Sequence, residues 1–216
     1  MSKLAMTTRR AAALALGSAL ILALAPALAA DAAQVGVQID TEAGAIVLAL
    51  DAAAAPLTVA NFRAYVERGL FKGATFYRSV GPANDNNPAT LSVIQGGLGD
   101  LPGALPPIAH ETTARSGLRH GDGVISMARD APGSASSEFF ICLGDNPALD
   151  FGGRRNADGQ GFAAFGRVVR GMDVVRKIHA MPALTRSDDP YLKGQMIAQP
   201  VRILGARRVD LAALVD

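Results

Sequence analysis

The segment Val124-Ile-Ser-Met-Ala-Arg-Asp-Ala-Pro-Gly-Ser-Ala-Ser-Ser-Glu-Phe-Phe-Ile141 carries more information about the architecture of this chain than any other part. Two apolar runs rich in strand-forming residues lie on either side of a loop of small residues, a pattern that predicts two short strands. We expect these strands to bring four residues onto one apolar surface: Met127, Ala128, Phe139 and Phe140.

Outside this segment, the chain contains further short runs of the same kind, separated by clusters of Gly, Pro, Asn and Asp. They predict strands. With the two above, the predicted strands cover residues 34–40, 45–50, 75–79, 91–95, 123–128, 139–143, 163–169 and 201–209. Helical spacing of apolar residues predicts two helices, one from Pro56 to a stop at Gly69 and one over residues 171–180. Periodicity alone therefore predicts a mainly-β domain with two helices.

Two further motifs, Phe76-Tyr77-Arg78 and Ile94-Gln95-Gly96-Gly97, precede the opening segment in the chain. In order and character, the three segments resemble the cyclophilins, which are barrel-shaped peptidyl-prolyl cis-trans isomerases. The resemblance extends roughly from Val35 to Val209. It implies a closed eight-stranded antiparallel β-barrel capped by two α-helices, in one cyclophilin-like domain over residues 31–216.

The resemblance also implies a site. Arg78 matches the catalytic arginine of the family. Seven positions are expected to bind substrate: Phe76, Gln95, Met127, Ala128, Phe140, Leu149 and Phe162. Phe162 stands where the family commonly has His or Tyr. Gln95 is the most telling of the seven, because an amide in an apolar strand must find partners or face a solvent-filled cleft.

The chemistry of such a site needs no nucleophile, general base or cofactor. The peptide bond before proline favours trans only weakly, but its rotation barrier is about 20 kcal/mol because the nitrogen lone pair is conjugated with the carbonyl. A catalyst needs only to bind the twisted amide more tightly than the planar one. An arginine can donate a hydrogen bond to the nitrogen as its lone pair becomes localised, while an apolar wall holds the proline ring.

Several positions depart from the family pattern. Ser92 and Val93 replace an aromatic–methionine pair, and Glu138 replaces a glutamine. Ala148 stands where Trp or Phe is common, which should weaken contact with cyclosporin-type inhibitors. An insertion at residues 80–90 is interpreted as a specificity loop or a plain insertion. These departures motivate one alternative to the isomerase hypothesis, a proline-segment binding module or folding helper with little turnover. A third possibility, a structural barrel without a peptide site, fits the composition but leaves the clustered polar matches unexplained.

Residues 1–30 have the features of an export signal. Basic residues precede an apolar stretch, and Ala27-Leu28-Ala29 supplies the small-x-small pattern of a signal peptidase site. A transmembrane anchor would need about 20 uninterrupted apolar residues, and Pro26 shortens this run. We therefore expect cleavage and a periplasmic or otherwise exported protein.

Charge and rare residues restrict the partners. The formal net charge is +2. Residues 1–30 hold three basic residues and no acidic one, which leaves about −1 for the rest of the chain. This balance does not indicate a nucleic-acid or membrane-surface role. We expect a monomer that binds unfolded proline-containing polypeptides.

The cysteine and the histidines do not indicate reactive or metal-binding sites. Cys142 has apolar neighbours, which predict a buried, inert thiol. The wide spacing of His110, His120 and His179 predicts no metal site.

Overall fold

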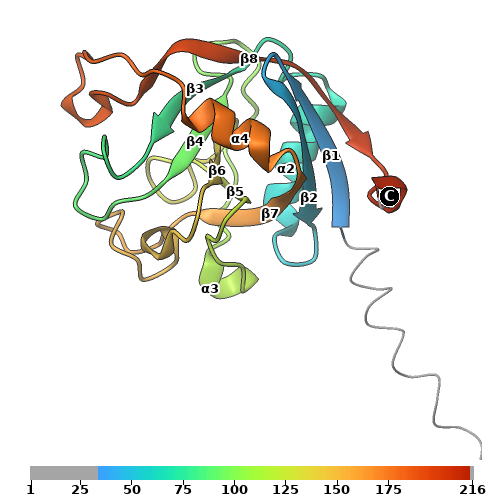
Figure 1. The fold of residues 1–216 in the computed structure, drawn as a ribbon. Coiled ribbons are helices and arrows are strands. Elements are labelled where there is room, and N and C mark those ends of the chain that lie inside the picture. Colours follow the sequence, from blue (N-terminus) through green and yellow to red (C-terminus); the bar gives the residue numbers. More distant parts are fainter. Residues whose placement is uncertain (1–33, 215–216) are drawn as a thin grey trace, which may run out of the picture. The chain divides into compact units, whose positions relative to one another are not determined.

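Eight antiparallel strands close into a barrel in the computed structural model, which describes residues 34–214 (Figure 1). The strands are β1 (Gln34–Thr41), β2 (Gly44–Asp51), β3 (Thr75–Val80), β4 (Val93–Gly97), β5 (Val124–Met127), β6 (Phe139–Cys142), β7 (Ala163–Arg170) and β8 (Met196–Val209). Their order around the barrel is β1-β2-β7-β5-β6-β4-β3-β8, and β8 pairs with β1. The predicted barrel is confirmed. The predicted export signal at residues 1–30 lies outside the described residues.

Within residues 34–214, the helices are α2 (Pro56–Glu67), α3 (Thr113–Ser116) and α4 (Met172–His179), with 3₁₀ turns η1 (Pro147–Leu149), η2 (Pro190–Leu192) and η3 (Ala212–Leu214). Helices α2 and α4 are the two that periodicity predicted. Both bury apolar side chains in the barrel core. The single turn α3 was not predicted, because four residues are too few to show a helical period.

Helix α2 begins and ends where its sequence indicates. Pro56 occupies the first turn, where a missing N–H costs nothing. Phe62 and Tyr65 are buried on the side that faces the barrel. At the other end Gly69 takes a φ of +66°, and the Leu70 N–H donates to the Tyr65 carbonyl at 2.9 Å. This left-handed termination is the stop that the glycine predicted.

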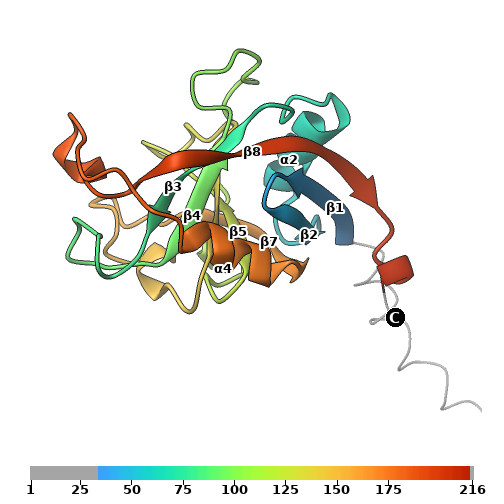
Figure 2. The same ribbon diagram turned by 45° about the horizontal axis from the view of Figure 1, so that its top comes forward.

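Strand β8 is longer than its sequence suggests. It begins at Met196, five residues before the predicted start at Val201, and crosses the barrel to pair with β3 and β1 (Figure 2). This longer strand includes Pro200, which cannot donate a hydrogen bond to a ladder. The structure accommodates Pro200 at a register shift, where Phe76 pairs with Val201 but Arg78 pairs with Met196.

A β-bulge in β3 places Phe76 and Arg78 on opposite faces of the barrel wall. Phe76 pairs with Gly96 and Arg78 pairs with Gln95, so Tyr77 is an extra residue relative to β4. Phe76 consequently faces the core, whereas Arg78, two residues later, faces outward. A regular strand would place both on one side. Gly96 is needed opposite the ring, since a Cβ there would lie 2.9 Å from a Phe76 ring carbon.

The opening segment divides its apolar residues between these two faces. Met127 and Phe139 belong to the barrel core, whereas Phe140 belongs to a second cluster on the outer face, with Ala128 packed against it. The prediction that these four residues line one surface is wrong, because successive side chains of a strand point to opposite sides. On the core side, a group of aromatic rings packs among aliphatic side chains at centroid distances of 5.1–5.6 Å: Phe62, Phe71, Phe76, Phe139 and Phe165.

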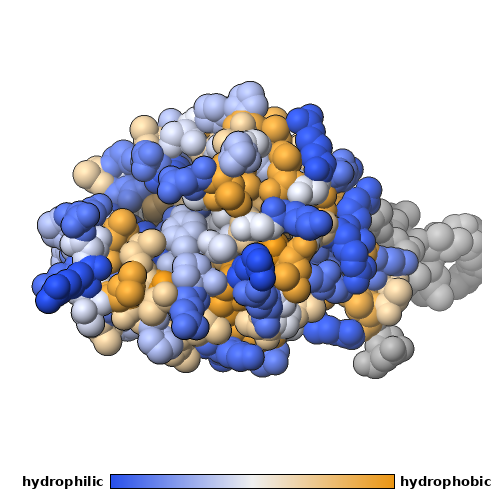
Figure 3. Space-filling view, turned by 90° about the horizontal axis from the view of Figure 1, so that it is seen from above, coloured by the Kyte–Doolittle hydropathy of each residue, from blue (hydrophilic) through white to orange (hydrophobic). Residues whose placement is uncertain are grey.

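The outer surface mixes apolar and polar side chains. On the face seen in Figure 3, apolar residues lie in small groups among hydrophilic ones. Scattered apolar residues of this kind are ordinary on protein surfaces. In the part of the chain that the structure describes, no helix has the length and apolar character needed to cross a bilayer.

Candidate active site

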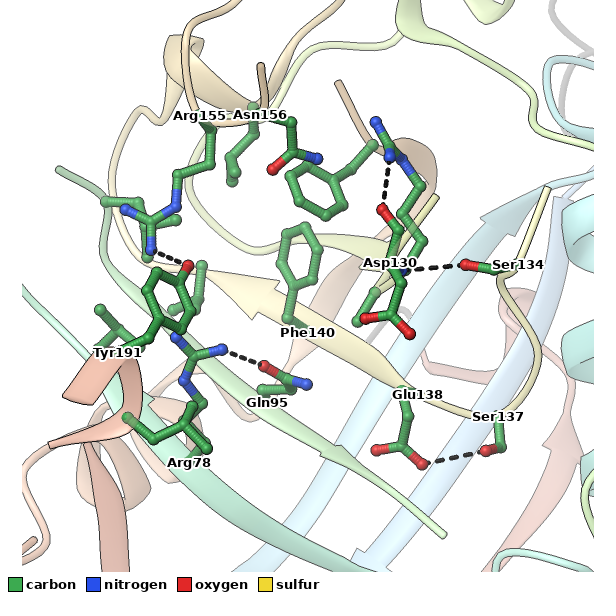
Figure 4. Close-up of a pocket in the computed structure, with 18 of the residues that line it drawn as sticks. Arg78, Gln95, Asp130, Ser134, Ser137, Glu138, Phe140, Arg155, Asn156 and Tyr191 are labelled. Atoms are coloured by element: carbon green, nitrogen blue, oxygen red, sulfur yellow. Dashed lines mark hydrogen bonds between the residues drawn. The ribbon is translucent and has the colours of Figure 1, made fainter. Parts of the chain in front are cut away.

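A cavity of about 410 Å³ lies on the outer side of β3, β4 and β6 (Figure 4). The strands supply Arg78, Gln95 and Phe140 to its lining. Residues 128–138, 149–162 and 189–192 contribute the surrounding walls. The cavity therefore combines three rigid strands with loops that come from distant parts of the sequence.

The floor of the cavity is apolar. Phe140 is only 5% exposed, and its ring meets the Phe162 ring edge to face at a centroid distance of 5.4 Å. The cluster around Phe140 is separate from the barrel core and consists of Val80, Leu91, Val93, Cys142 and Leu149, with Ala128 and Phe162 packed against it. These side chains form a wall against which a small apolar ring can be desolvated.

The Arg78 guanidinium lines the same cavity and is held by hydrogen bonds. Its Nη1 donates to Gln95 Oε1 at 3.0 Å, and its Nε and Nη2 donate to Gln195 Oε1 at 3.0 and 2.6 Å. The Tyr191 ring lies 5.1 Å from Arg78 Cζ, within cation–π distance. Figure 4 shows the guanidinium between Gln95 and Tyr191, beside Phe140. These contacts therefore hold the plane of the Arg78 guanidinium in one orientation.

A second chain of hydrogen bonds orients the Gln95 amide. Gln95 Nε2 donates to the Tyr77 hydroxyl at 2.9 Å, and that hydroxyl donates to Glu138 Oε2 at 2.5 Å. Burial, together with the Glu138 carboxylate, raises the pKa of Tyr77, so the hydroxyl keeps its proton. Because Gln95 Nε2 is directed to Tyr77, its Oε1 faces Arg78. Glu138 thus takes part in the site through Tyr77.

The insertion at residues 80–90 supports the opposite wall through Arg155, which lines the cavity. Asp85 Oδ2 accepts a hydrogen bond from Arg155 Nη1 at 2.7 Å, and the two side chains are 0% and 3% exposed. Arg155 Nη2 in turn donates to the Tyr191 hydroxyl at 2.8 Å. Through Arg155, the insertion is therefore linked to Tyr191, whose ring packs against the Arg78 guanidinium.

Arg129 supports the Phe162 ring. Its Cζ lies 5.2 Å from the ring centroid, and its Nε and Nη2 donate to the Gly161 carbonyl at 2.9 and 2.6 Å. Hydrogen bonds from Arg129 lower the pKa of Asp158 from 3.8 to about 2, so this carboxylate keeps its charge in mild acid as well as at neutral pH. The ion pair of Arg129 with Asp158 therefore holds Arg129 against the Phe162 ring on one side of the cavity.

A Ser–His–Asp arrangement lies behind the cavity floor. His120 Nδ1 is 2.8 Å from Asp150 Oδ1, and Nε2 is 2.9 Å from Ser126 Oγ. Ser126 is 0% exposed and does not line the cavity, so it is not placed to act as a hydrolytic nucleophile. The His120 ring instead stacks on Phe140 at a centroid distance of 6.0 Å. Its role in this structure is to support the floor.

Acidification should destabilise the protein through His120. Burial lowers the pKa of His120 below its ordinary 6.5, although Asp150 opposes the shift. Below pH 6.5 the unfolded chain binds a proton that the folded protein does not, so the free energy of unfolding should fall by up to about 1.4 kcal/mol per pH unit. Urea unfolding between pH 8 and pH 5 measures this slope. His120→Asn should lose it, and an identical slope in that variant would contradict the assignment.

The structure brings six of the eight predicted site residues to the cavity: Arg78, Gln95, Ala128, Phe140, Leu149 and Phe162. It places Phe76 and Met127 elsewhere. Phe76 is 0% exposed in the barrel core because of the bulge at Tyr77, and Met127 is 1% exposed there because it precedes the outward-facing Ala128. Both can influence the site only through the packing of the barrel.

Among the residues that contribute to the cavity or hold Arg78 but were not predicted, four make the contacts described above: Arg129, Arg155, Tyr191 and Gln195. Arg129 directly follows the predicted Ala128, so its position was a usable signal. The other three lie in long loops or before a strand, where no periodicity applies. Among the residues that the structure describes, no three His, Cys, Asp or Glu side chains gather where they could hold a metal ion. Cys142 is buried, as predicted.

Comparison with known proteins places this geometry in a family. The family model described as cyclophilin type peptidyl-prolyl cis-trans isomerase/CLD matches residues 36–207. The chain belongs to the cyclophilin family. This cyclophilin is 39% identical over 176 residues to peptidyl-prolyl cis-trans isomerase A of Dickeya dadantii, covering 79% of the chain and 83% of that protein. It is 40% identical to isomerase cyp18 of Streptomyces antibioticus, covering 78% of the chain and 98% of that protein.

Solved structures agree with the barrel fold of this cyclophilin. The crystal structure of a cyclophilin-type isomerase of Cryptosporidium parvum matches with a TM-score of 0.63 at 21% identity, covering 82% of this chain and 98% of that one. Family and relatives together show that the protein is a peptidyl-prolyl cis-trans isomerase. Its substrates are proline-containing polypeptides.

Proposed function

We propose that Arg78 is the catalytic group of this isomerase and that the cavity binds the X-Pro segment, with substrate contacts from Gln95, Ala128, Phe140, Leu149 and Phe162. One observation carries the proposal: a guanidinium held by three hydrogen bonds lines the same cavity as an apolar aromatic floor. The floor takes the proline ring and excludes water, and the cation lies beside it.

The hydrogen bonds of Arg78 leave donors for the substrate. A guanidinium has five N–H groups, and three of them are engaged with Gln95 and Gln195. One N–H remains on Nη1 and one on Nη2. Directed at the prolyl nitrogen, such a donor stabilises the lone pair only when rotation has removed its conjugation, so it favours the twisted amide over the planar one.

Gln95 has a matching role toward the substrate backbone. One hydrogen of its Nε2 is given to Tyr77, which leaves the second for a substrate carbonyl. With the proline ring on the floor and a carbonyl held at Gln95, only one side of the imide bond remains free to turn. Fixing one side in this way lowers the entropy cost of reaching the twisted state.

We further propose that residues 1–30 direct export and that the substrates are proteins folding outside the cytoplasm. The basic start, apolar stretch and small-x-small pattern support this. Prolyl isomerisation takes about 10–100 s uncatalysed and can limit folding. An exported isomerase would act on newly delivered chains at this step.

Expression of the full chain in a Gram-negative host tests export and turnover together. We expect the periplasmic fraction to contain a protein whose mass corresponds to a start near residue 31 and that accelerates relaxation of an X-Pro peptide. A chain starting at residue 31 should remain in the cytoplasm with the same activity once purified. Full-length protein found only in the cytoplasm would refute export, and a purified chain without acceleration would refute the assignment of the catalytic site.

A further inference from the structure

Gln195 is the strongest hydrogen-bond partner of Arg78 and lies outside the motifs that identify the family in this chain. It is 0% exposed, precedes β8 and is 117 residues from Arg78 in the sequence. Its Oε1 accepts from both Nε and Nη2 of Arg78, whereas Gln95 accepts from Nη1 alone. Two donors converging on one oxygen fix both the position and the tilt of the guanidinium plane.

The orientation of the Gln195 amide is set by the inserted segment. Its Nε2 donates to the backbone carbonyl of Asn84 at 2.9 Å, while the Ser79 N–H donates to the Gln195 carbonyl at 2.9 Å. A flipped amide would direct its NH₂ at the N–H groups of Arg78 and its oxygen at the Asn84 carbonyl. Both contacts would be repulsive. The Asn84 carbonyl therefore determines that an acceptor faces Arg78.

Asn84 is itself held by backbone groups of β3 and of the turn before β8. Its Nδ2 donates to the Ser79 carbonyl at 3.1 Å and to the Gly194 carbonyl at 2.8 Å, and its Oδ1 accepts from the Gly81 N–H at 2.7 Å. The side chain thus joins the end of β3 to the residue before Gln195. An inserted loop held in this way positions its neighbours and does not merely extend into solvent.

The same insertion balances charge around Arg78. The Tyr191 ring lies within 5.1 Å of Arg78 Cζ and 5.7 Å of Arg155 Cζ, so two guanidinium groups share one ring. Asp85 forms a buried ion pair with Arg155. This carboxylate offsets the second positive charge, which would otherwise repel Arg78.

We propose that Gln195 is a positioning residue for isomerisation: oriented by Asn84 of the insertion, it holds the Arg78 guanidinium in the direction that the twisted imide requires. The inference rests on the proposed catalytic role of Arg78. It assigns a function to the insertion, because the insertion supplies the acceptor for Gln195 and the counter-charge for Arg155. Gln195 acts through Arg78 and does not touch the substrate.

A double-mutant cycle tests the proposal. Gln195→Met keeps most of the side-chain volume and removes the acceptor. We expect about a tenfold loss of kcat, with KM for an X-Pro peptide within about twofold of its original value. In an Arg78→Ala background the same change should alter kcat/KM by less than about twofold, because there is no guanidinium left to hold. The exposed Gln199→Met serves as the matched control and should leave all parameters unchanged.

NMR gives a second measurement that does not depend on turnover. The Arg78 Nε–H resonance should exchange faster with solvent in Gln195→Met, and its shift should remain unchanged in Gln199→Met. A full tenfold loss in both backgrounds, or an unchanged Nε–H in Gln195→Met, would overturn the positioning role. If Arg78→Ala alone leaves kcat/KM unaltered, the proposed catalytic role of Arg78 fails instead.

Discussion

Replacing Arg78 with alanine is expected to lower kcat/KM for an X-Pro peptide by about 10²–10³-fold, the range found when one pre-organised donor to a transition state is removed. The change removes the only guanidinium that is hydrogen-bonded to both Gln95 and Gln195 among the described residues. Peptide affinity should change far less, because the donor acts mainly on the twisted amide. Line-shape analysis of cis and trans peptide resonances measures both quantities.

Two further variants define the requirement. Arg78→Lys keeps the charge but lacks the fork that reaches both glutamines, and we expect it to recover only a small part of the rate. Arg68→Ala removes an exposed arginine at the end of α2 and should have no effect. A rate within threefold of the original chain in Arg78→Ala would show that catalysis lies elsewhere.

Replacing Phe140 with alanine should impair both binding and folding. The ring forms the floor of the cavity and packs between Phe162 and His120. Loss of an enclosed phenyl group typically costs 3–5 kcal/mol. We expect about 3 kcal/mol here, because one side of the ring faces an open cavity. KM for the peptide should rise, since the proline ring loses its apolar contact. Urea unfolding and peptide titration of the folded variant measure these effects.

Phe139→Ala is the matched control. Phe139 directly precedes Phe140 in the chain, but its ring lies in the barrel core at 0% exposure. It should cost more stability than Phe140→Ala, toward about 5 kcal/mol, and leave peptide affinity of the folded protein largely intact. Unchanged turnover in folded Phe140→Ala would contradict the assignment of the proline pocket.

Much of the barrel could be predicted because its strands and helices are local patterns. The helix from Pro56 has its own start and stop signals, and the predicted strand at residues 163–169 is a short run with glycines near both ends, at Gly161 and Gly171. The closed topology came from family resemblance. It depends on pairings such as β2 with β7, which link segments more than a hundred residues apart and leave no local trace.

The site was predicted less completely, for two physical reasons. The faces of Phe76 and Met127 depend on bulge position and strand alternation, neither of which a motif match states. The partners of Arg78 depend on loop contacts such as Asp85 with Arg155, which span 70 residues. Predicting such contacts requires the three-dimensional path of the chain, which the composition of the loops does not reveal.

The bulge in β3 increases the number of functional side chains that one strand can present on the outer face of the barrel. An ordinary strand offers every second side chain to one face, about 7 Å apart. The additional residue allows Tyr77 and Arg78, consecutive in the chain, to act on the same outer face, where both bond to Gln95. A six-residue strand can therefore hold the cation and orient its glutamine without widening the barrel.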